Sequence, residues 1–222
     1  MPYDPDRHHR RSIRLKGYDY TQEGVYYITI CTHNRQCLFG EVVQGEMVLN
    51  ALGQIVWDCW HETPHHFPQV ELDAFVVMPN HVHMVMIVGR GTACRAPTNA
   101  AVRGTACRAP TDAAVQGTAC RAPTGTERRF GQPIAGSLPT IVGAFKSAVT
   151  KRINELRASP GAKVWQRGYY EHIIRSDRAL DRIRAYIAAN PARWALDPEN
   201  LVRQGEDDFD RWLASFGNRA LE

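Results

Sequence analysis

An apolar hairpin with two histidines beside its turn constrains the fold of this chain most. The runs 70–77 and 81–88 are rich in β-branched residues, and Met78-Pro79-Asn80 between them is a turn sequence. On a strand, residues i and i+2 point to the same face, so His81 and His83 would direct both imidazoles to one point. The pair indicates a metal site, with a structural pair satisfied by neighbouring acidic side chains as the alternative.

Apolar periodicity divides the rest of the chain into alternating strands and helices. The order strand, helix, strand, strand, helix, strand predicts an α+β fold, a ferredoxin-like βαββαβ sandwich with a central antiparallel sheet, followed by an extra C-terminal helix. The expected elements are a strand over 24–32, a short strand over 37–43, a helix over 51–61 capped by Asn50, the hairpin, a helix over 137–158, a strand region over 164–174, and a helix from Ser176 or Asp177 to about Asn190.

A tandem repeat interrupts this pattern. Gly-Thr-Ala-Cys-Arg-Ala-Pro-Thr occurs at 91–98, 104–111 and 117–124, a period too short for a solenoid and without apolar periodicity. We therefore expect a flexible insert at about 90–130 within a domain spanning 24–195, with a basic arm over 1–23 and a polar tail over 196–222. The repeat arginines either contact phosphate or are solvated filler.

Charge and cysteine content narrow the class of protein. The net charge is +4, but residues 90–129 carry seven Arg against one Asp and one Glu, so the rest of the chain sums to −1. Basic segments on a near-neutral body suit a polyanionic partner, although solvated charge explains them equally well.

No apolar run is long enough to span a membrane and no signal peptide is evident, so we expect a cytoplasmic protein. Three cysteines lie in the repeats and three are scattered, which fits neither a disulfide framework nor a zinc ribbon.

The last predicted helix carries a second candidate site. Tyr186 and Asn190 lie four residues apart and share a face with Arg182. A phenol and a carboxamide at this spacing are a candidate nucleophile and metal ligand. An amphipathic helix whose tyrosine covers the core is the alternative.

The segment 165–175 carries a third candidate site. Alternation places Tyr170 and His172 on one face of a strand, between Arg167 and Arg175. Aromatic rings interleaved with arginine suit single-stranded nucleic acid, and a cross-strand aromatic cluster is the alternative.

Taken together, these motifs resemble the REP-associated tyrosine transposases, which belong to the single-tyrosine HUH transposases. The resemblance covers residues 10–89 and 134–195 and leaves out the repeat insert. The segments that carry it are 78–83, 165–175 and 186–194, supported by 10–15 and 32–35.

The resemblance implies a role for each motif residue. His81, His83 and Asn190 would bind a divalent metal, Mg²⁺ or Mn²⁺, and Tyr186 would be the catalytic nucleophile that forms a covalent 5′-phosphotyrosine. A phenol is a poor nucleophile at neutral pH, so we expect the metal or Arg182 to favour the phenolate.

The implied partner is single-stranded or hairpin DNA with a palindromic REP-like sequence, and the chain would be an endonuclease and strand transferase, as a monomer or a homodimer. One alternative is a domesticated DNA-binding protein with little cleavage. Another is a metal hydrolase with His172 as third ligand and no covalent adduct. The candidate DNA-binding residues are Arg10, Arg11, Arg14, Lys146, Lys151, Arg152, Arg167, Tyr170, His172, Arg175 and Arg182.

Overall fold

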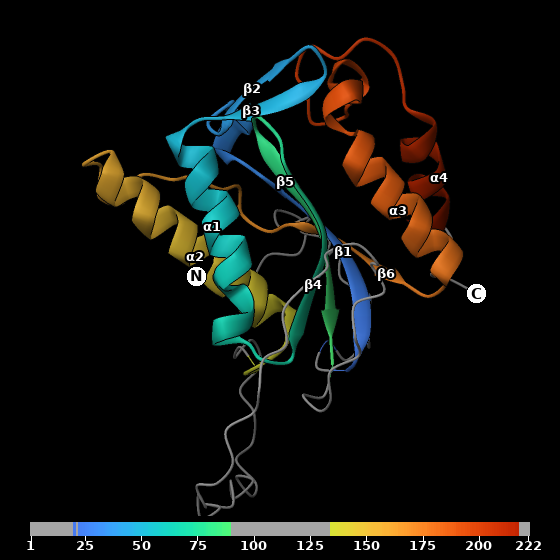
Figure 1. Cartoon of the computed structure of the whole chain (residues 1–222), viewed down its shortest axis with the longest axis horizontal. Helices are drawn as coiled ribbons and strands as arrows, with labels where there is room; N and C mark the ends of the chain where they lie inside the picture. Colours follow the sequence, from blue (N-terminus) through green and yellow to red (C-terminus); the bar gives the residue numbers. More distant parts are fainter. Residues whose placement is uncertain (1–19, 21, 90–133, 218–222) are drawn as a thin grey trace, which may run out of the picture. The chain divides into compact units, whose positions relative to one another are not determined.

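The computed structural model describes residues 20, 22–89 and 134–217 (Figure 1). The repeat insert and most of the basic arm, including Arg10, Arg11 and Arg14, lie outside the described residues. The elements in chain order are β1 (Gly24–Cys31), the 3₁₀ turn η1 (His33–Arg35), β2 (Gly40–Val43), β3 (Glu46–Leu49), α1 (Ala51–His66), β4 (Val70–Val77), β5 (His81–Val88), α2 (Leu138–Leu156), β6 (Tyr170–Ile174), α3 (Asp177–Ala189), the 3₁₀ helix η2 (Pro191–Leu196) and α4 (Asp208–Gly217).

Four strands form an antiparallel sheet in the order β4-β5-β1-β6. Strand β5 lies between β1 and β4, which are joined through α1, and this is the split βαβ arrangement of the ferredoxin-like fold. The predicted α+β class and central antiparallel sheet are therefore confirmed. In the register, Cys31 lies opposite His81, Thr29 opposite His83, and Tyr27 opposite Val85.

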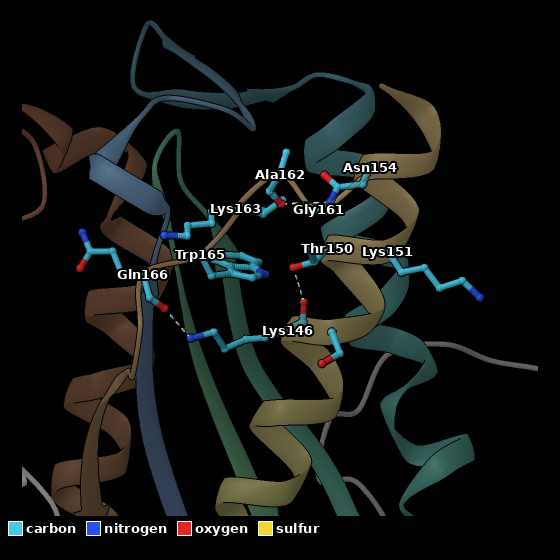
Figure 2. A pocket seen from close by; sticks show the side chains of 11 residues that line it. Lys146, Thr150, Lys151, Asn154, Gly161, Ala162, Lys163, Trp165 and Gln166 are labelled. Carbon is cyan, nitrogen blue, oxygen red and sulfur yellow. Dashed lines mark hydrogen bonds between the residues drawn. The ribbon is translucent and has the colours of Figure 1, made fainter. Parts of the chain in front are cut away.

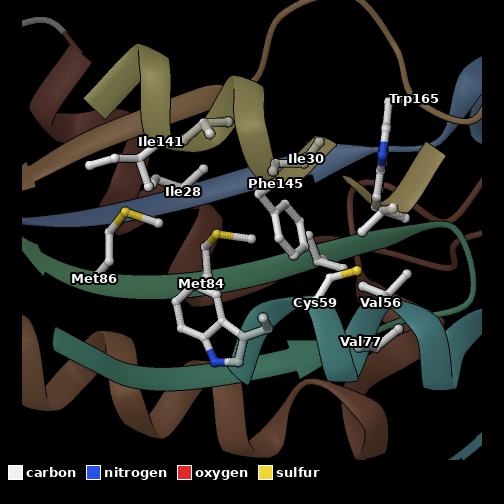
Figure 3. Close-up of a cluster of buried hydrophobic side chains, with 14 of the residues drawn as sticks. Ile28, Ile30, Val56, Cys59, Val77, Met84, Met86, Ile141, Phe145 and Trp165 are labelled. Carbon is white, nitrogen blue, oxygen red and sulfur yellow. The ribbon is translucent and has the colours of Figure 1, made fainter. Parts of the chain in front are cut away.

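Helices α1 and α2 cover one face of the sheet and bury the main core (Figures 1 and 3). Full burial of each large aliphatic or aromatic side chain stabilises the fold by about 1.5–3 kcal/mol. This core holds the alternate residues of β1 and β5 that point away from the histidines. They include Tyr26, Ile28, Ile30, Val82, Met84 and Met86, packed against Val56, Trp60, Ile141 and Phe145.

Helix α3 covers the opposite face and is the extra helix that the sequence predicts (Figure 1). The Ser176 hydroxyl accepts a hydrogen bond from the Ala179 N–H and caps its N-terminus. Ile183 and Ile187 pack onto the sheet, and Arg184 makes two hydrogen bonds to Asp73 on β4. Packing and this ion pair together fix the helix that carries Tyr186 against the strand that carries the histidines.

Three predicted elements differ in the structure. The strand region expected over 164–174 is a strand only over β6, and its first part contributes an isolated bridge between Thr32 and Trp165. Helix α1 continues past His61 to His66 and includes Pro64, which has no N–H to donate, and the Phe67 N–H closes its last turn by donating to the Thr63 carbonyl. The short strand expected over 37–43 is half of a hairpin, β2 and β3. Its turn residues Gln44 and Gly45 both have positive φ (53° and 82°), as a two-residue hairpin turn requires.

The segment expected as a polar tail packs onto α3 as far as it is described. Phe209, Trp212 and Leu213 follow helical spacing and lie in the α3 cluster, with Phe209 only 4% exposed. Among the helices in the described part of the chain, none combines the length and apolar character needed to cross a bilayer.

Candidate metal centre

His81 and His83 are buried on the sheet face that α3 covers. Their Nε2 atoms lie 3.0 Å apart. The Oδ2 atom of Asp197, after η2, lies 3.6 Å from His81 Nε2 and 3.9 Å from His83 Nε2. These three ligand atoms are close enough to hold one metal ion. Two imidazoles and a carboxylate are a donor set that divalent metals use in catalytic sites.

The side chain of Asn80 sets the tautomer of His81. Its Nδ2 donates to the backbone carbonyls of Glu199 (2.7 Å) and Arg35 (3.3 Å), which only accept. The Asn80 Oδ1 therefore faces His81 Nδ1 at 2.8 Å, and Nδ1 must carry the proton. Neutral His81 consequently presents an unprotonated Nε2 to His83 and Asp197, as metal binding requires.

Two hydroxyls of β1 hold the His83 ring at its Nδ1 without fixing its tautomer. Tyr27 Oη and Thr29 Oγ1 each lie 2.9 Å from His83 Nδ1. Both hydroxyls are able to donate or accept, so His83 is able to adopt the tautomer with a free Nε2. The antiparallel register positions these partners, because Thr29 lies opposite His83 and Tyr27 two residues further along.

The electrostatics of the cluster favour the protonation states that bind metal. Burial and the neighbouring His83 lower the pKa of His81 to about 3. Burial opposes ionisation of Asp197, but attraction to His83 and His81 and the hydrogen bond from Asn190 hold its pKa well below the usual range. At neutral pH the cluster therefore combines a neutral imidazole with a carboxylate.

Asn190, the predicted third metal ligand, lies next to Asp197. Its Nδ2 donates to Asp197 Oδ2 at 2.9 Å, and the side chain is buried. Its Oδ1 is buried without a hydrogen-bond partner, which costs free energy unless another group contacts it. This orphaned oxygen fits the chemistry of a metal ligand, because amide oxygens coordinate divalent cations.

Tyr186 lies beside the histidines, a position that its spacing on the helix did not predict. Its ring packs edge-on to His83, with 5.3 Å between centroids, and stacks on Phe209 at 3.7 Å. Burial, followed by Tyr27 and Asp197, raises the pKa of its phenol well above the usual value. The expectation that Arg182 favours the phenolate gains no support, because its guanidinium lies over the Trp212 ring at 4.5 Å.

The β6 residues share the face of the metal cluster but do not join it. Tyr170 lies opposite Thr29 and His172 opposite Tyr27 in the register. Burial, followed by Arg175, lowers the pKa of His172. The described residues bring Asp197 rather than His172 to the histidine pair, so the three-histidine arrangement is not formed.

The candidate DNA-binding cations are in different environments. Arg152 is engaged by both oxygens of Glu62. Lys146 donates to two backbone carbonyls. Lys151 is largely exposed, with Glu155 3.9 Å away. Arg167, Arg175 and Arg182 are exposed.

Sequence reasoning missed Asp197 and Asn80. The sequence places Asn80 in the turn between the strands, but it does not reveal that the side chain of Asn80 orients His81. Asp197 lies in a segment without a regular spacing of residues, so no sequence pattern predicts that it belongs to the site.

The fold and the site define an α+β sandwich with a buried site, made by two histidines and a carboxylate, that can hold a metal ion beside a buried tyrosine. An uncharacterised protein of Haemophilus influenzae is 41% identical over 197 residues, which cover 88% of this chain and 95% of that protein. This chain belongs to the family of that protein. No family model matches this chain.

Two solved structures are similar to this chain. One is a REP-associated tyrosine transposase bound to a REP hairpin, with a TM-score of 0.44 and 15% identity over 82% of this chain and 74% of the other. The second is described as a "putative transposase" of Deinococcus radiodurans, with a TM-score of 0.39 and 16% identity over 79% of this chain and 95% of the other.

Proposed function

We propose that this protein is a metal-dependent endonuclease and strand transferase for single-stranded DNA, with Tyr186 as the nucleophile. The observation that supports this most is the position of Tyr186, whose ring lies 5.3 Å from that of His83 in the His81–His83–Asp197 cluster. The motif resemblance to REP-associated tyrosine transposases supplies the substrate class, palindromic hairpin DNA with a single-stranded flank.

The residues present fit a divalent metal ion. His81, His83 and Asp197 would hold it, with the orphaned Asn190 Oδ1 as a further ligand. Mixed nitrogen and oxygen donors suit Mn²⁺ or Mg²⁺. When bound, such an ion polarises a phosphoryl oxygen and offsets the negative charge of the transition state.

The protein's own groups hold these ligands ready. Asn80 directs the free Nε2 of His81 into the cluster, and Tyr27 and Thr29 hold the ring of His83 at its Nδ1. Asn190 holds Asp197 through its amide nitrogen. Because these ligands are held in place beforehand, they do not have to rearrange during the reaction. Such preorganisation is a main source of the rate enhancement of enzymes.

Tyr186 performs the covalent step. Its phenolate oxygen attacks phosphorus, the bond from phosphorus to the 3′ oxygen breaks, and the leaving oxygen takes up a proton. The products are a 5′-phosphotyrosine and a free 3′-hydroxyl, and the reverse step joins strands without ATP. Because its surroundings raise the pKa of Tyr186, the phenolate needs a nearby positive charge, which a cation among the histidines would supply.

The test is adduct formation. Incubation with labelled single-stranded hairpin DNA and Mn²⁺ should give a protein–DNA complex that survives a denaturing gel, and Tyr186→Phe should abolish it. Tyr169→Phe and Tyr170→Phe are the matched controls and should retain the adduct. Hairpin binding without any adduct in the unmodified protein would favour the domesticated DNA-binding alternative. The absence of both binding and adduct would overturn the proposed function.

A further inference from the structure

One cation beside the metal cluster has no role in the mechanism described above. Arg35 ends the turn η1, and its backbone carbonyl accepts a hydrogen bond from Asn80 Nδ2 at 3.3 Å. The Oδ1 atom of the same asparagine accepts from His81 Nδ1 at 2.8 Å. A single side chain therefore separates Arg35 from one of the proposed metal ligands.

The backbone of Arg35 adopts a conformation that is unusual for arginine. Its φ is 52° and that of Asn34 is 55°, so both residues lie in the left-handed region. Asparagine tolerates this region, whereas it is strained for a residue with a long side chain, and such strained residues cluster at functional sites. Because glycine would adopt this conformation without strain, the arginine side chain itself is the feature to explain.

Hydrogen bonds hold the turn in this conformation. Thr32, which precedes the turn, pairs through an isolated bridge with Trp165, which Figure 2 shows in the segment 161–166. The Thr32 hydroxyl also donates to the backbone carbonyl of Gln36, on the far side of the turn, at 2.8 Å. The backbone is thus fixed on both sides of Arg35, and its side chain starts from a defined position.

The guanidinium of Arg35 has unused donors. Its Nε lies 3.0 Å from Glu199 Oε2, and its side chain is 40% exposed. No hydrogen bond from its two Nη atoms is found among the described residues. The backbone N–H of Glu199 donates to Asp197 Oδ1 at 2.7 Å, so the ion pair holds Arg35 against the segment that carries the third proposed ligand. The two Nη atoms form a planar fork that matches two phosphate oxygens.

The positive charge of Arg35 acts on the buried cluster. Burial and His83 are the main causes that lower the pKa of His81, and Arg35 adds to them. Tyr186 packs against the cluster at His83, whereas Arg35 is connected to it at His81 through Asn80. A phosphate held at the cluster would therefore have the proposed nucleophile near one histidine and the guanidinium near the other.

We propose that Arg35 is a further catalytic residue, whose Nη atoms donate hydrogen bonds to the nonbridging oxygens of the scissile phosphate. This inference rests on the proposed function, in which Tyr186 attacks that phosphate. The phenolate oxygen bonds to phosphorus, the bond from phosphorus to the 3′ oxygen breaks, and that oxygen takes up a proton from water. Negative charge gathers on the nonbridging oxygens in the transition state, and Arg35 stabilises it without transferring a proton.

The experiment separates the Arg35 side chain from the turn that carries it. Arg35→Gly removes the guanidinium and suits the left-handed backbone, and Arg35→Lys keeps the charge without the fork. Asn34→Gly is the matched control, because it makes the same backbone change one residue earlier, at an exposed side chain. Urea unfolding establishes that each variant is folded. Adduct formation is timed with Mn²⁺ and saturating hairpin DNA, and DNA affinity is measured in EDTA at several salt concentrations.

We expect Arg35→Gly to form the adduct about 100-fold more slowly, the usual effect of removing one donor to transition-state charge. Added guanidinium, below the concentration that unfolds the protein, should restore part of this rate, and Arg35→Lys should give an intermediate rate. In EDTA the slope of log affinity against log salt should fall by about 0.7 in Arg35→Gly, the value for one phosphate contact on a single strand. Asn34→Gly should change neither the rate nor the slope.

Equal rates of adduct formation in Arg35→Gly and the unmodified protein would overturn this inference and leave the proposed function standing. A lost rate that guanidinium does not restore, together with an unchanged salt slope, would also overturn it, because Arg35 would then act only through the structure of the turn. If the unmodified protein forms no adduct, the proposed function fails, and this inference fails with it.

Discussion

At the scale of single residues, the site depends on groups that do not themselves meet the substrate. Asn80 illustrates this, because its two donated bonds to carbonyls force its oxygen toward His81. The His81–His83 pair is predictable from alternation on a strand. The hydrogen-bond partners of the two Nδ1 atoms are not predictable in this way, since they lie on the neighbouring strand and in the turn.

Replacement of Asn80 by alanine should weaken metal binding by about 10–100-fold, because His81 loses the acceptor that fixes its tautomer. Calorimetric titration with Mn²⁺ measures the affinity. Asn50→Ala, which removes a helix cap remote from the site, serves as the control and should leave metal affinity unchanged. Equal Mn²⁺ affinity in Asn80→Ala and the unmodified protein would contradict the role given to Asn80.

The metal-free protein should lose stability as pH falls from about 6.5 toward 3. The pKa of His81 is about 3 in the folded state and about 6.5 when unfolded, so the unfolded chain binds the extra proton in this window. The expected slope is about 1.4 kcal/mol per pH unit from this one group. Urea unfolding at several pH values measures it, and His81→Gln should flatten the curve. An unchanged slope in that variant would show that another group titrates.

At the scale of elements, the C-terminal helix is the largest departure from the sequence expectation. Its apolar residues have the spacing of an amphipathic helix, yet their partner surface on α3 cannot be known before α3 is placed on the sheet. The consequence is that Phe209 stacks on Tyr186 and leaves that side chain only 4% exposed. Helix α4 therefore covers the ring of the proposed nucleophile.

Phe209→Ala should expose Tyr186 and destabilise the fold by about 3–5 kcal/mol, the usual cost of truncating a buried phenylalanine. Mass spectrometry after iodination should then show faster modification of Tyr186. Phe209→Leu is the control, since it keeps an apolar cover and should give an intermediate rate. A rate identical in all three proteins would mean that Phe209 does not limit access.

At the scale of the whole molecule, the sheet joins two separately packed layers. The face toward α1 and α2 is apolar, and the face toward α3 carries the His81–His83–Asp197 cluster at one end of β5. The two functions of the sheet are thus divided between alternate residues of the same strands. Stability rests mainly on the first face, and the proposed chemistry on the second.

Metal binding should raise the stability of the entire domain, because the cluster joins β5 to the segment after η2. At a concentration one hundred times the dissociation constant, Mn²⁺ should add about 2.7 kcal/mol to the free energy of unfolding. Thermal unfolding with Mn²⁺ and with EDTA measures the difference. His83→Ala should abolish it, whereas His61→Ala, on an exposed position of α1, should keep it. Stabilisation retained in His83→Ala would place the ion elsewhere.

The sequence by itself determined the order of the four sheet strands and of helices α1, α2 and α3, the shared face of His81 and His83, and the shared helix face of Tyr186 and Asn190. These follow from local periodicity, since a strand repeats every two residues and a helix every 3.6. Only the tertiary structure decided that Asp197 completes the cluster, that Asn80 orients His81 and that Phe209 covers Tyr186. Each of these contacts joins residues of separate segments or depends on side-chain geometry, and no repeat in the sequence encodes them.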